Sequence, residues 1–495
     1  MTETHATRPA QGAPPTTGKG GDSPGLGRFL ARAAVVTAAL TAAGSFFGLL
    51  RDQAIARLFG ADADTDAFLV AWTIPELAST LLIEDAMALI LVPAFSLALS
   101  RRAARSAAGE TGLPDEPDPV WGVVTATLPR LALGLVAATA MVALTAPFLV
   151  GVLAPGLPDA KTAVDCMRLT SLTVASFGLA GYFSAALRAH GRFVAPAAIY
   201  VAYNVAIIAV MFAGHAAWGV RAAAVGVAVG GLLMVLVQLP SFVARLTSRT
   251  TRLAGRAARA TRAAPTSRVA LLGFGLLAPV VTFALSRQAQ VFYERYLASS
   301  LPAGAISHLN YAQKVAQLPM VLSLMVCTVT FPVVARAMAD GDTERARRRV
   351  ERDLALVGIV VLLGAAYVMA CAPQIIQLLF ERGAFDARDT ADTASVMRVY
   401  SCGLLGHSMV GALVRPFFSG ARPTWYPAAA MGFGLAVTVV AGAIAVRWWG
   451  VHGIAAANAL GIVAAALLLM RGLGARVVAI DVRRVAAGLV RLLLA

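Results

Sequence analysis

Long apolar stretches recur along almost the whole chain, from about residue 33 to about residue 472. They have the length, about 18 residues or more, that an α-helix needs to cross the hydrocarbon core of a bilayer. They lack the alternation of apolar and polar residues that marks the strands of a membrane β-barrel. The sequence therefore predicts an all-α polytopic membrane protein.

The composition agrees with this class of protein. Hydrophobic residues make up 58% of the 495 residues and charged residues only 14%, whereas soluble chains carry about 25% charged residues. Much of the net charge of +16 lies in short loops between the apolar stretches, where Lys and Arg are typical of the cytoplasmic side. Attraction to anionic membrane lipids is a second consequence, and we expect no nucleic-acid partner.

Twelve membrane spans fit the apolar pattern. The second and the eighth each contain two prolines, which predicts kinked or broken helices. The approximate limits of the spans are 29–50, 66–100, 122–153, 163–187, 193–214, 219–243, 269–293, 305–335, 354–380, 391–418, 424–446 and 451–471.

The basic loops indicate how these spans are organised. Arginine-rich loops alternate with poorer ones from end to end, which places both termini in the cytoplasm. The basic linker 244–268 lies midway along the spans and predicts two six-helix lobes, 29–243 and 269–472, around a central cavity. We expect residues 1–28 to form a disordered cytoplasmic tail. Residues 473–495 are basic and amphipathic, and they either lie at the membrane surface or begin a further span.

Several charged residues lie within or beside the predicted spans. A charge at the centre of a bilayer costs about 2.5–3.5 kcal/mol, so such residues usually face a partner or a water-filled cavity. Most of them fall in the first two spans of each lobe and would converge on the cavity. They are Arg51, Asp52, Asp66, Glu76, Glu84, Asp85, Arg287, Glu294, Lys314 and Arg415.

Three of these residues favour a functional cavity over a structural role. Glu84 lies deep within the second span. Arg287 and Lys314 have apolar neighbours and no opposite charge within one helical turn.

For other candidates two interpretations stay open. Arg51 and Asp52 are adjacent at the predicted end of the first span, where a local ion pair fits as well as a ligand site. Asp66 is either a capping residue of the second helix or part of the site.

The sign of these charges indicates the chemistry of the substrate. Arg and Lys in a low-dielectric cleft attract phosphate, and Arg binds it through two hydrogen bonds at once. A substrate that carries a pyrophosphate would suit such a cavity. The acidic residues would either separate the cations in the empty cavity or bind an ion or proton during the cycle.

The chain shows no nucleotide-binding loop, hydrolase motif or metal-ligand spacing. We therefore expect a transporter rather than an enzyme, and no cofactor.

Four segments, in the same order along the chain, resemble one family. "GLLRDQAIARLFGADADTDAFLVAW" (48–72) followed by "IEDAMALILVPAFS" resembles the N-terminal signature of the MurJ (MviN) family. Its members are lipid II flippases of the multidrug/oligosaccharidyl-lipid/polysaccharide exporter superfamily. "LASSLPAGAISHLNYAQKVAQLPM", "LLFERGAFDARDTADTA" and "GVHGIAAANALG" resemble later parts of the same family.

This resemblance implies a fold and a function. The fold would be two six-helix lobes around a cationic cavity. The substrate would be an undecaprenyl-pyrophosphate-linked peptidoglycan precursor, moved across the cytoplasmic membrane by alternating access. Membrane lipids and cell-wall synthesis proteins would be neighbours of the chain. Positions that are important for function in the family correspond to Arg51, Asp52, Asp66, Glu84 and Lys314. At the last of these positions most members have Arg.

The chain also departs from the family pattern. Ser45 and Ser79 stand where many members have Arg, and Gln313 with Lys314 replaces an Asp-Arg pair. Fewer cavity arginines weaken the attraction for pyrophosphate, for which Arg287, absent in most members, would compensate.

Two further departures concern the eleventh span. Thr438 and Gly442 stand where members usually carry Asn, which leaves a coupling ion, Na⁺ or H⁺, open. A flippase for another polyprenyl-linked glycan, a cation-coupled drug exporter and a non-transporting scaffold for cell-wall synthesis stay as alternatives.

The leading hypothesis is thus a lipid II flippase. Cations would bind the diphosphate, and the acidic residues would change partners as the lobes move. The predicted substrate-site residues are Arg51, Asp52, Asp66, Glu84, Arg287, Gln313 and Lys314.

Overall fold

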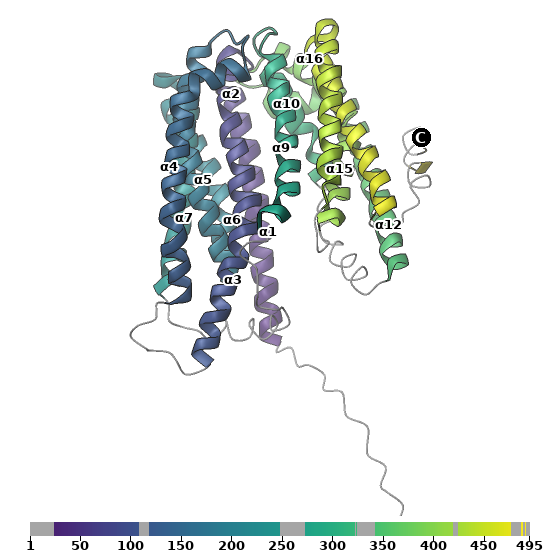
Figure 1. Ribbon diagram of the computed structural model, residues 1–495. Coiled ribbons are helices and arrows are strands. Elements are labelled where there is room, and N and C mark those ends of the chain that lie inside the picture. Colours follow the sequence, from purple (N-terminus) through teal and green to yellow (C-terminus); the bar gives the residue numbers. More distant parts are fainter. Residues whose placement is uncertain are drawn as a thin grey trace, which may run out of the picture.

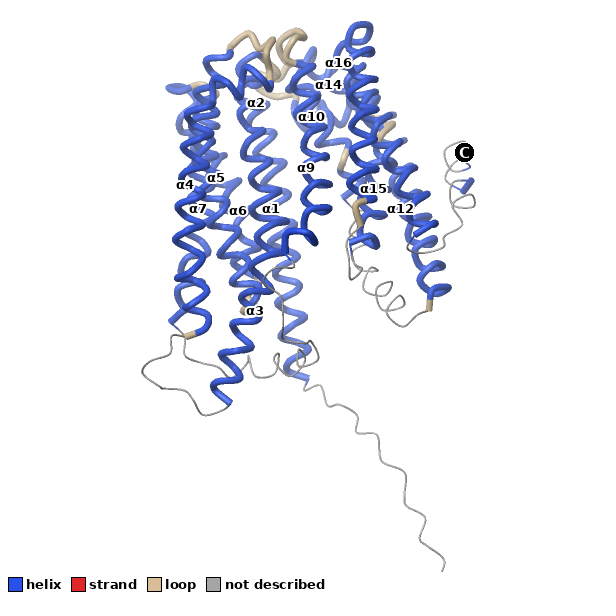
Figure 2. Tube along the Cα trace, in the orientation of Figure 1, coloured by secondary structure: helices blue, strands red, loops and turns tan. Residues whose placement is uncertain are grey.

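The computed structural model describes residues 24–107, 118–247, 273–321, 323, 342–418 and 424–476, together with 487, 488 and 491. In this part of the chain every regular element is a helix, and Figures 1 and 2 show the long helices packed with their axes roughly aligned. Among the described residues, eight helices are long and apolar enough to cross a membrane. The chain is therefore an all-α polytopic membrane protein, as its apolar stretches predicted.

The N-terminal bundle comprises α1 (Pro24–Phe59), α2 (Ala63–Ala78), η1 (Ser79–Asp85), α3 (Ala86–Ala107), α4 (Pro119–Leu153), α5 (Ala160–Ala189), α6 (Val194–Trp218) and α7 (Arg221–Thr247). Helix α5 is the central element and packs against α2, α3, α4 and α7. Helix α1 packs mainly against α6, on the side of the bundle that faces the second half of the chain.

Helix α1 is longer than the predicted first span of 29–50. It begins at Pro24, inside the predicted tail, and ends at Phe59. Arg51 and Asp52 therefore lie inside a continuous helix, so the interpretation that placed them at a span end was wrong. The two residues form a local ion pair, one of the two interpretations left open, and Lys314 of α10 and Asn204 of α6 add further partners, so the helix can continue through them.

The predicted break in the second span is present. Helix α2 passes into a π-helical segment, η1, before α3 continues. Pro75 of α2 has no N–H to offer the carbonyl of Ala71, one turn earlier. Thr170 of α5 takes its place, since its hydroxyl donates to the Ala71 oxygen at 3.3 Å. Segments of this kind frequently occur at functional sites.

The C-terminal bundle comprises α9 (Gly273–Ala298), α10 (Ala305–Ala316), α12 (Thr343–Ala370), α13 (Ala372–Phe380), α14 (Ala387–Ser401), α15 (Leu404–Phe418) and α16 (Tyr426–Arg476). The predicted ninth span corresponds to α12 with α13, and the tenth to α14 with α15. The predicted eighth span is described only from α10 to residue 321 and at residue 323.

Helix α16 folds back on itself at Gly450, whose φ of 52° lies in the left-handed region. Its two arms are antiparallel. The hydroxyl of Tyr426, at the start of the first arm, donates to the carbonyl of Leu468, near the end of the second, at 2.7 Å. The arms correspond to the predicted spans 424–446 and 451–471.

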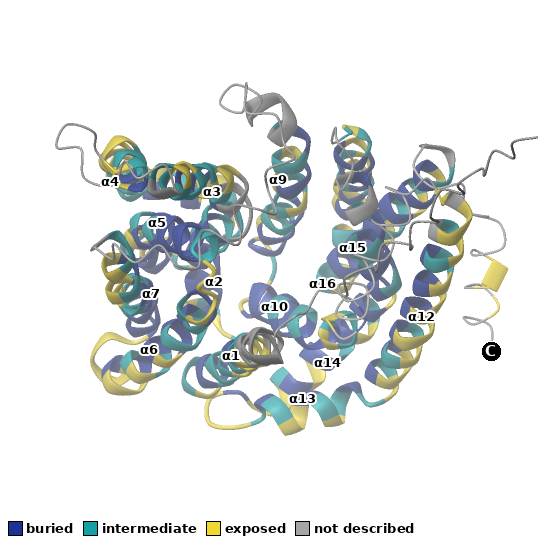
Figure 3. Cartoon of the chain, turned by 90° about the horizontal axis from the view of Figure 1, so that it is seen from below, coloured by how far each residue is buried: buried dark blue, intermediate teal, exposed yellow. Residues whose placement is uncertain are grey.

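Helix α10 lies between the two bundles. It contacts α2 as well as α9, α14 and α16, and Figure 3 shows it near the centre of the molecule. One buried hydrophobic cluster includes Phe68 of α2 and Leu309 of α10. Charged side chains on α10 and its neighbours therefore meet between the bundles.

Parts of three predicted segments lie outside the described residues. They are 1–23 of the tail, 248–268 of the basic linker, and 477–495 apart from three residues.

Candidate functional site

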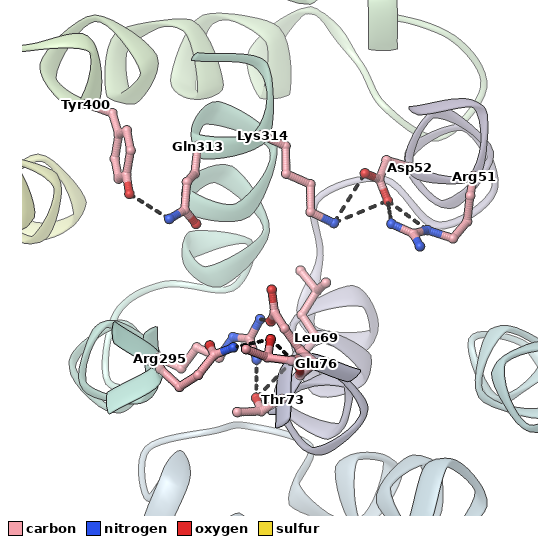
Figure 4. A network of polar contacts seen from close by, with 11 residues as sticks. Arg51, Asp52, Leu69, Thr73, Glu76, Arg295, Gln313, Lys314 and Tyr400 are labelled. Atoms are coloured by element: carbon pink, nitrogen blue, oxygen red, sulfur yellow. Dashed lines mark hydrogen bonds and ion pairs between the residues drawn. The ribbon is translucent and has the colours of Figure 1, made fainter. Parts of the chain in front are cut away.

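An ion cluster joins α1 of the N-terminal bundle to α10 of the C-terminal bundle (Figure 4). The Asp52 carboxylate accepts hydrogen bonds from Nη2 of Arg51 at 2.7 Å and from Nε at 3.0 Å, and it lies 3.2 Å from Nζ of Lys314. Only 8% of the Asp52 side chain is exposed. Two cations thus face one enclosed carboxylate, which leaves the cluster with a net positive charge.

The two cations differ in their freedom. Besides Asp52, Arg51 donates from Nη1 to Oδ1 of Asn204 on α6 at 2.9 Å, and its guanidinium lies 4.7 Å from the ring centre of Trp72. Lys314 bonds only to Asp52 among the described residues, and 32% of its side chain is exposed. Arg51 is therefore fixed in place, whereas Lys314 is accessible to a ligand.

A second ion pair links the bundles beside the first (Figure 4). Arg295 of α9 donates from Nη2 to Oε2 of Glu76 on α2 at 3.1 Å, and from Nη1 to the hydroxyl of Thr73. Thr73 and Glu76 are three residues apart and share a helix face, so they offer two acceptors to one guanidinium. Glu76 was among the predicted intramembrane charges, whereas Arg295 was not, because only the folded chain brings α9 beside Glu76.

One face of α9 points toward a pocket between α9 and α10. Val291, Glu294 and Arg295 line this pocket together with Gln313 of α10. Arg287 lies one turn before Val291 and so shares this face. Its side chain is exposed and has no hydrogen-bond or ionic partner within the described part of the chain.

A buried polar network extends from the pocket into the C-terminal bundle. Glu294 accepts a hydrogen bond from Asn458 on α16, whose Oδ1 lies 3.1 Å from Nε2 of His407 on α15. Gln313 donates to the hydroxyl of Tyr400 on α14 at 2.6 Å, and the Tyr400 ring stacks on His407. Gln313 therefore belongs to this network rather than to the ion cluster on α1.

Asp66 lies apart from both ion clusters. Its carboxylate accepts the backbone N–H groups of Gly304 and Ser307, each at 2.8 Å, and the Ser307 hydroxyl at 2.6 Å. It thus caps α10. The N-cap of α2 is Asp62. The interpretation of Asp66 as a cap of the second helix was therefore wrong, since the helix that it caps is α10.

Backbone turns from both bundles meet at the end of the molecule that holds Asp66. Gly60, Gly304 and Gly383 have φ values of 66°, 91° and 67°, which glycine adopts far more readily than other residues. A Cβ atom at Gly60 would lie 2.8 Å from the carbonyl oxygen of Ala384, and the Ala384 N–H donates to the carbonyl of Arg57 at 2.9 Å. We name this contact, formed around the three glycines, the glycine junction.

The predicted site residues therefore fall into separate groups. Arg51, Asp52 and Lys314 meet in one ion cluster, while Asp66 lies at the glycine junction. Glu84 lies on η1, and its side chain is outside the described residues. That these residues bind a substrate stays a prediction.

A family model described as "Lipid II flippase MurJ" matches residues 55–495. The chain belongs to this family. A probable lipid II flippase MurJ of Rhizobium meliloti is 29% identical over 404 residues, which cover 79% of this chain and 71% of the relative. A lipid II flippase MurJ of Burkholderia cenocepacia is 29% identical over 400 residues, which cover 79% and 73%.

Solved structures share the fold. A lipid II flippase MurJ in an inward closed conformation matches with a TM-score of 0.70 at 17% identity and covers 93% of this chain and 91% of its own. An inward-facing multidrug resistance MATE family transporter of the MOP superfamily matches with a TM-score of 0.67 at 15% identity and covers 92% and 98%. At these identities the likeness concerns the fold alone.

The resemblance described above predicted that Ser45 and Ser79 stand in place of arginines. The Ser45 hydroxyl donates to the carbonyl of Thr41 in its own helix at 3.3 Å, and Ser79 begins η1. Neither supplies a cation. Arg295 brings a guanidinium to Glu76, within one helical turn of Ser79.

Thr438 and Gly442, which the resemblance predicted to stand in place of asparagines, make contacts with α9. Oγ1 of Thr438 lies 3.5 Å from Nε2 of Gln290. Gly442 leaves room for Tyr293, since a Cβ atom there would lie 3.1 Å from the tyrosine ring. Both positions thus serve the packing of α9 on α16, and coupling to Na⁺ or H⁺ stays a prediction.

Proposed function

We propose that this chain moves lipid II across the cytoplasmic membrane by alternating access of its two bundles. One observation carries the proposal. Arg51 from the N-terminal bundle and Lys314 from the C-terminal bundle meet over the single buried carboxylate of Asp52. A diphosphate would balance the excess positive charge, and its attraction to the cations is strong because the surroundings are poorly solvated.

The contacts support a distinct role for each member of the cluster. Lys314 is the ligand of the diphosphate, because its side chain is partly exposed and bonds to Asp52 alone among the described residues. Arg51 is a positioning residue that holds Asp52 between the bundles. When the diphosphate takes Lys314, Asp52 keeps its pair with Arg51, and the contact between the bundles is released.

The chain's basic residues support an orientation in the membrane. Arg101, Arg102, Arg188, Arg192 and Arg245 lie at or near the ends of α3, α5 and α7. Alternating helix directions put these ends on the side where α1 begins. This side is then cytoplasmic, with both termini, and the glycine junction closes the outer side.

Genetic complementation tests the proposal. Expression of this chain in a host depleted of its own lipid II flippase should restore growth. The variant Lys314→Ala should fail to do so, while Arg221→Ala should succeed, because Arg221 pairs with Asp165 inside the N-terminal bundle, away from the ion cluster. A correctly inserted wild-type chain that does not restore growth would contradict the proposal.

A second candidate is a flippase for another polyprenyl-linked glycan. Ser45 and Ser79 favour it, because a cavity with fewer cations attracts the diphosphate less strongly. Contacts with the glycan then contribute more to the choice of substrate. Binding of the purified chain to lipid II, measured in competition with other polyprenyl diphosphates, separates the candidates. Preference for another carrier would favour the second.

A further inference from the structure

We propose that Arg295 is an exchangeable ligand of the substrate: Glu76 holds it in the empty state, and the substrate diphosphate replaces Glu76 when it binds. This inference rests on the function proposed above. It adds a residue of α9 to the site and gives the interaction between α9 and α2 a part in the transport cycle.

The guanidinium of Arg295 is enclosed between the bundles. Only 7% of its side chain is exposed, and it bonds across the interface to Glu76 and Thr73 on α2. A buried cation needs a partner, because an unpaired one loses its hydration without compensation. Arg295 therefore keeps an anion beside it in every state in which it stays buried.

Its present anion is the more mobile member of the pair. The Glu76 side chain is 38% exposed, and its second carboxylate oxygen, Oε1, has no partner among the described residues. Glu76 can therefore turn into water at little cost, while Arg295 remains enclosed. The pair thus differs from Arg51 with Asp52, whose side chains are only 12% and 8% exposed and in which Asn204 holds the guanidinium as well.

The position of Arg295 suits an anionic headgroup. Arg295 lines the pocket between α9 and α10 together with Gln313, the residue before Lys314. Figure 4 shows the Arg295 pair beside the ion cluster of Lys314. Its Nε–H makes no hydrogen bond within the described residues, and a guanidinium with free donors binds phosphate oxygens through two hydrogen bonds. A diphosphate between the bundles can then take both Lys314 and Arg295.

The affinity of matched variants for undecaprenyl diphosphate tests this exchange. The full-length chain in lipid nanodiscs is titrated with undecaprenyl diphosphate, and the dissociation constant is measured. Glu76→Gln removes the competing anion and should tighten binding several-fold. Arg295→Gln should weaken it by about tenfold or more, the scale of a lost charge-assisted contact. The double variant should behave like Arg295→Gln, because Glu76 acts through Arg295.

A control and a conservative variant complete the test. Asp165→Asn breaks the ion pair with Arg221 inside the N-terminal bundle and should leave binding unchanged. Arg295→Lys keeps the charge and should bind more tightly than Arg295→Gln. If Arg295→Gln does not fold, Glu76→Gln decides, since weaker binding by that variant would overturn the exchange.

Two results overturn the inference in different ways. If the wild-type chain binds undecaprenyl diphosphate and Arg295→Gln binds it equally well, Arg295 is not part of the site, and the proposed function stays intact. A wild-type chain that binds no polyprenyl diphosphate removes the proposed function and the inference together.

Discussion

At the scale of single residues, Asn204 fixes the position of Arg51 in the ion cluster. Its side-chain oxygen accepts from Arg51 at 2.9 Å, and its nitrogen donates to the carbonyl of Gly44 at 3.1 Å. One buried amide thus joins α6 to α1 at two points and fixes the guanidinium that holds Asp52. Nothing in the sequence near Asn204 indicates this role, because its partners lie more than a hundred residues away.

The variant Asn204→Ala should destabilise the protein. It leaves one Arg51 nitrogen without its partner on α6, and a buried polar group left unpaired costs about 1–3 kcal/mol. The midpoint of thermal unfolding in detergent measures the effect. Thr145→Ala is the matched control, because the Thr145 hydroxyl bonds only to the Met141 carbonyl on an exposed face. Equal midpoints for the two variants would contradict the assigned role.

At the scale of helices, η1 is held by a close contact with α5. A Cβ atom added at Gly181 of α5 would clash with the carbonyl oxygen of Leu82 in η1. Because this neighbour is backbone, a side-chain rotation cannot relieve the clash. The position of η1, and with it the path of the chain from α2 to α3, depends on the absence of a side chain at Gly181.

The variant Gly181→Ala should therefore displace η1 and lower stability by about 1–3 kcal/mol, as other additions to packed sites do. Gly134→Ala should be neutral or stabilising by up to about 1 kcal/mol, since a Cβ atom at Gly134 meets nothing within 4 Å. Unfolding midpoints and complementation of both variants measure the difference. Normal stability and growth with Gly181→Ala would show that η1 does not depend on this contact.

At the scale of the whole molecule, Asp66 controls the glycine junction. Its carboxylate accepts three hydrogen bonds from Gly304 and Ser307, and it thereby fastens the start of α10 to α2. Transport by alternating access requires this end to open and close. The junction is therefore a contact that must be strong enough to form and weak enough to break.

The variant Asp66→Asn should weaken the junction, because an amide offers one acceptor atom where the carboxylate offers two. Faster hydrogen exchange of the amides in 304–308 should report the loss. Asp62→Asn is the control, since Asp62 caps α2 and Asn is an equally good N-cap. Unchanged exchange in Asp66→Asn would mean that the carboxylate does not hold the junction.

Much of this architecture could be predicted from the sequence, because a helix that crosses a membrane needs a long apolar stretch whatever its neighbours are. The partners of the charges could not. The ion pair of Arg51 with Asp52 was one of two interpretations left open, and it is present, but the contacts of Arg51 with α6 and α2, which let α1 continue, could not be seen in the sequence. Arg295 was missed because only the folded chain brings α9 beside Glu76. Asp66 is the fourth residue of α2, and nothing local shows that it caps α10.

The central claim is that Lys314, the exposed cation of the cluster that joins the two bundles, holds the diphosphate of the substrate. Translocation of fluorescent lipid II in proteoliposomes tests it most directly. The wild-type chain should move the lipid between leaflets, and Lys314→Ala should slow this by about tenfold or more. Lys314→Arg should retain most of the rate, since it keeps the charge. Translocation by Lys314→Ala at the wild-type rate would contradict the claim.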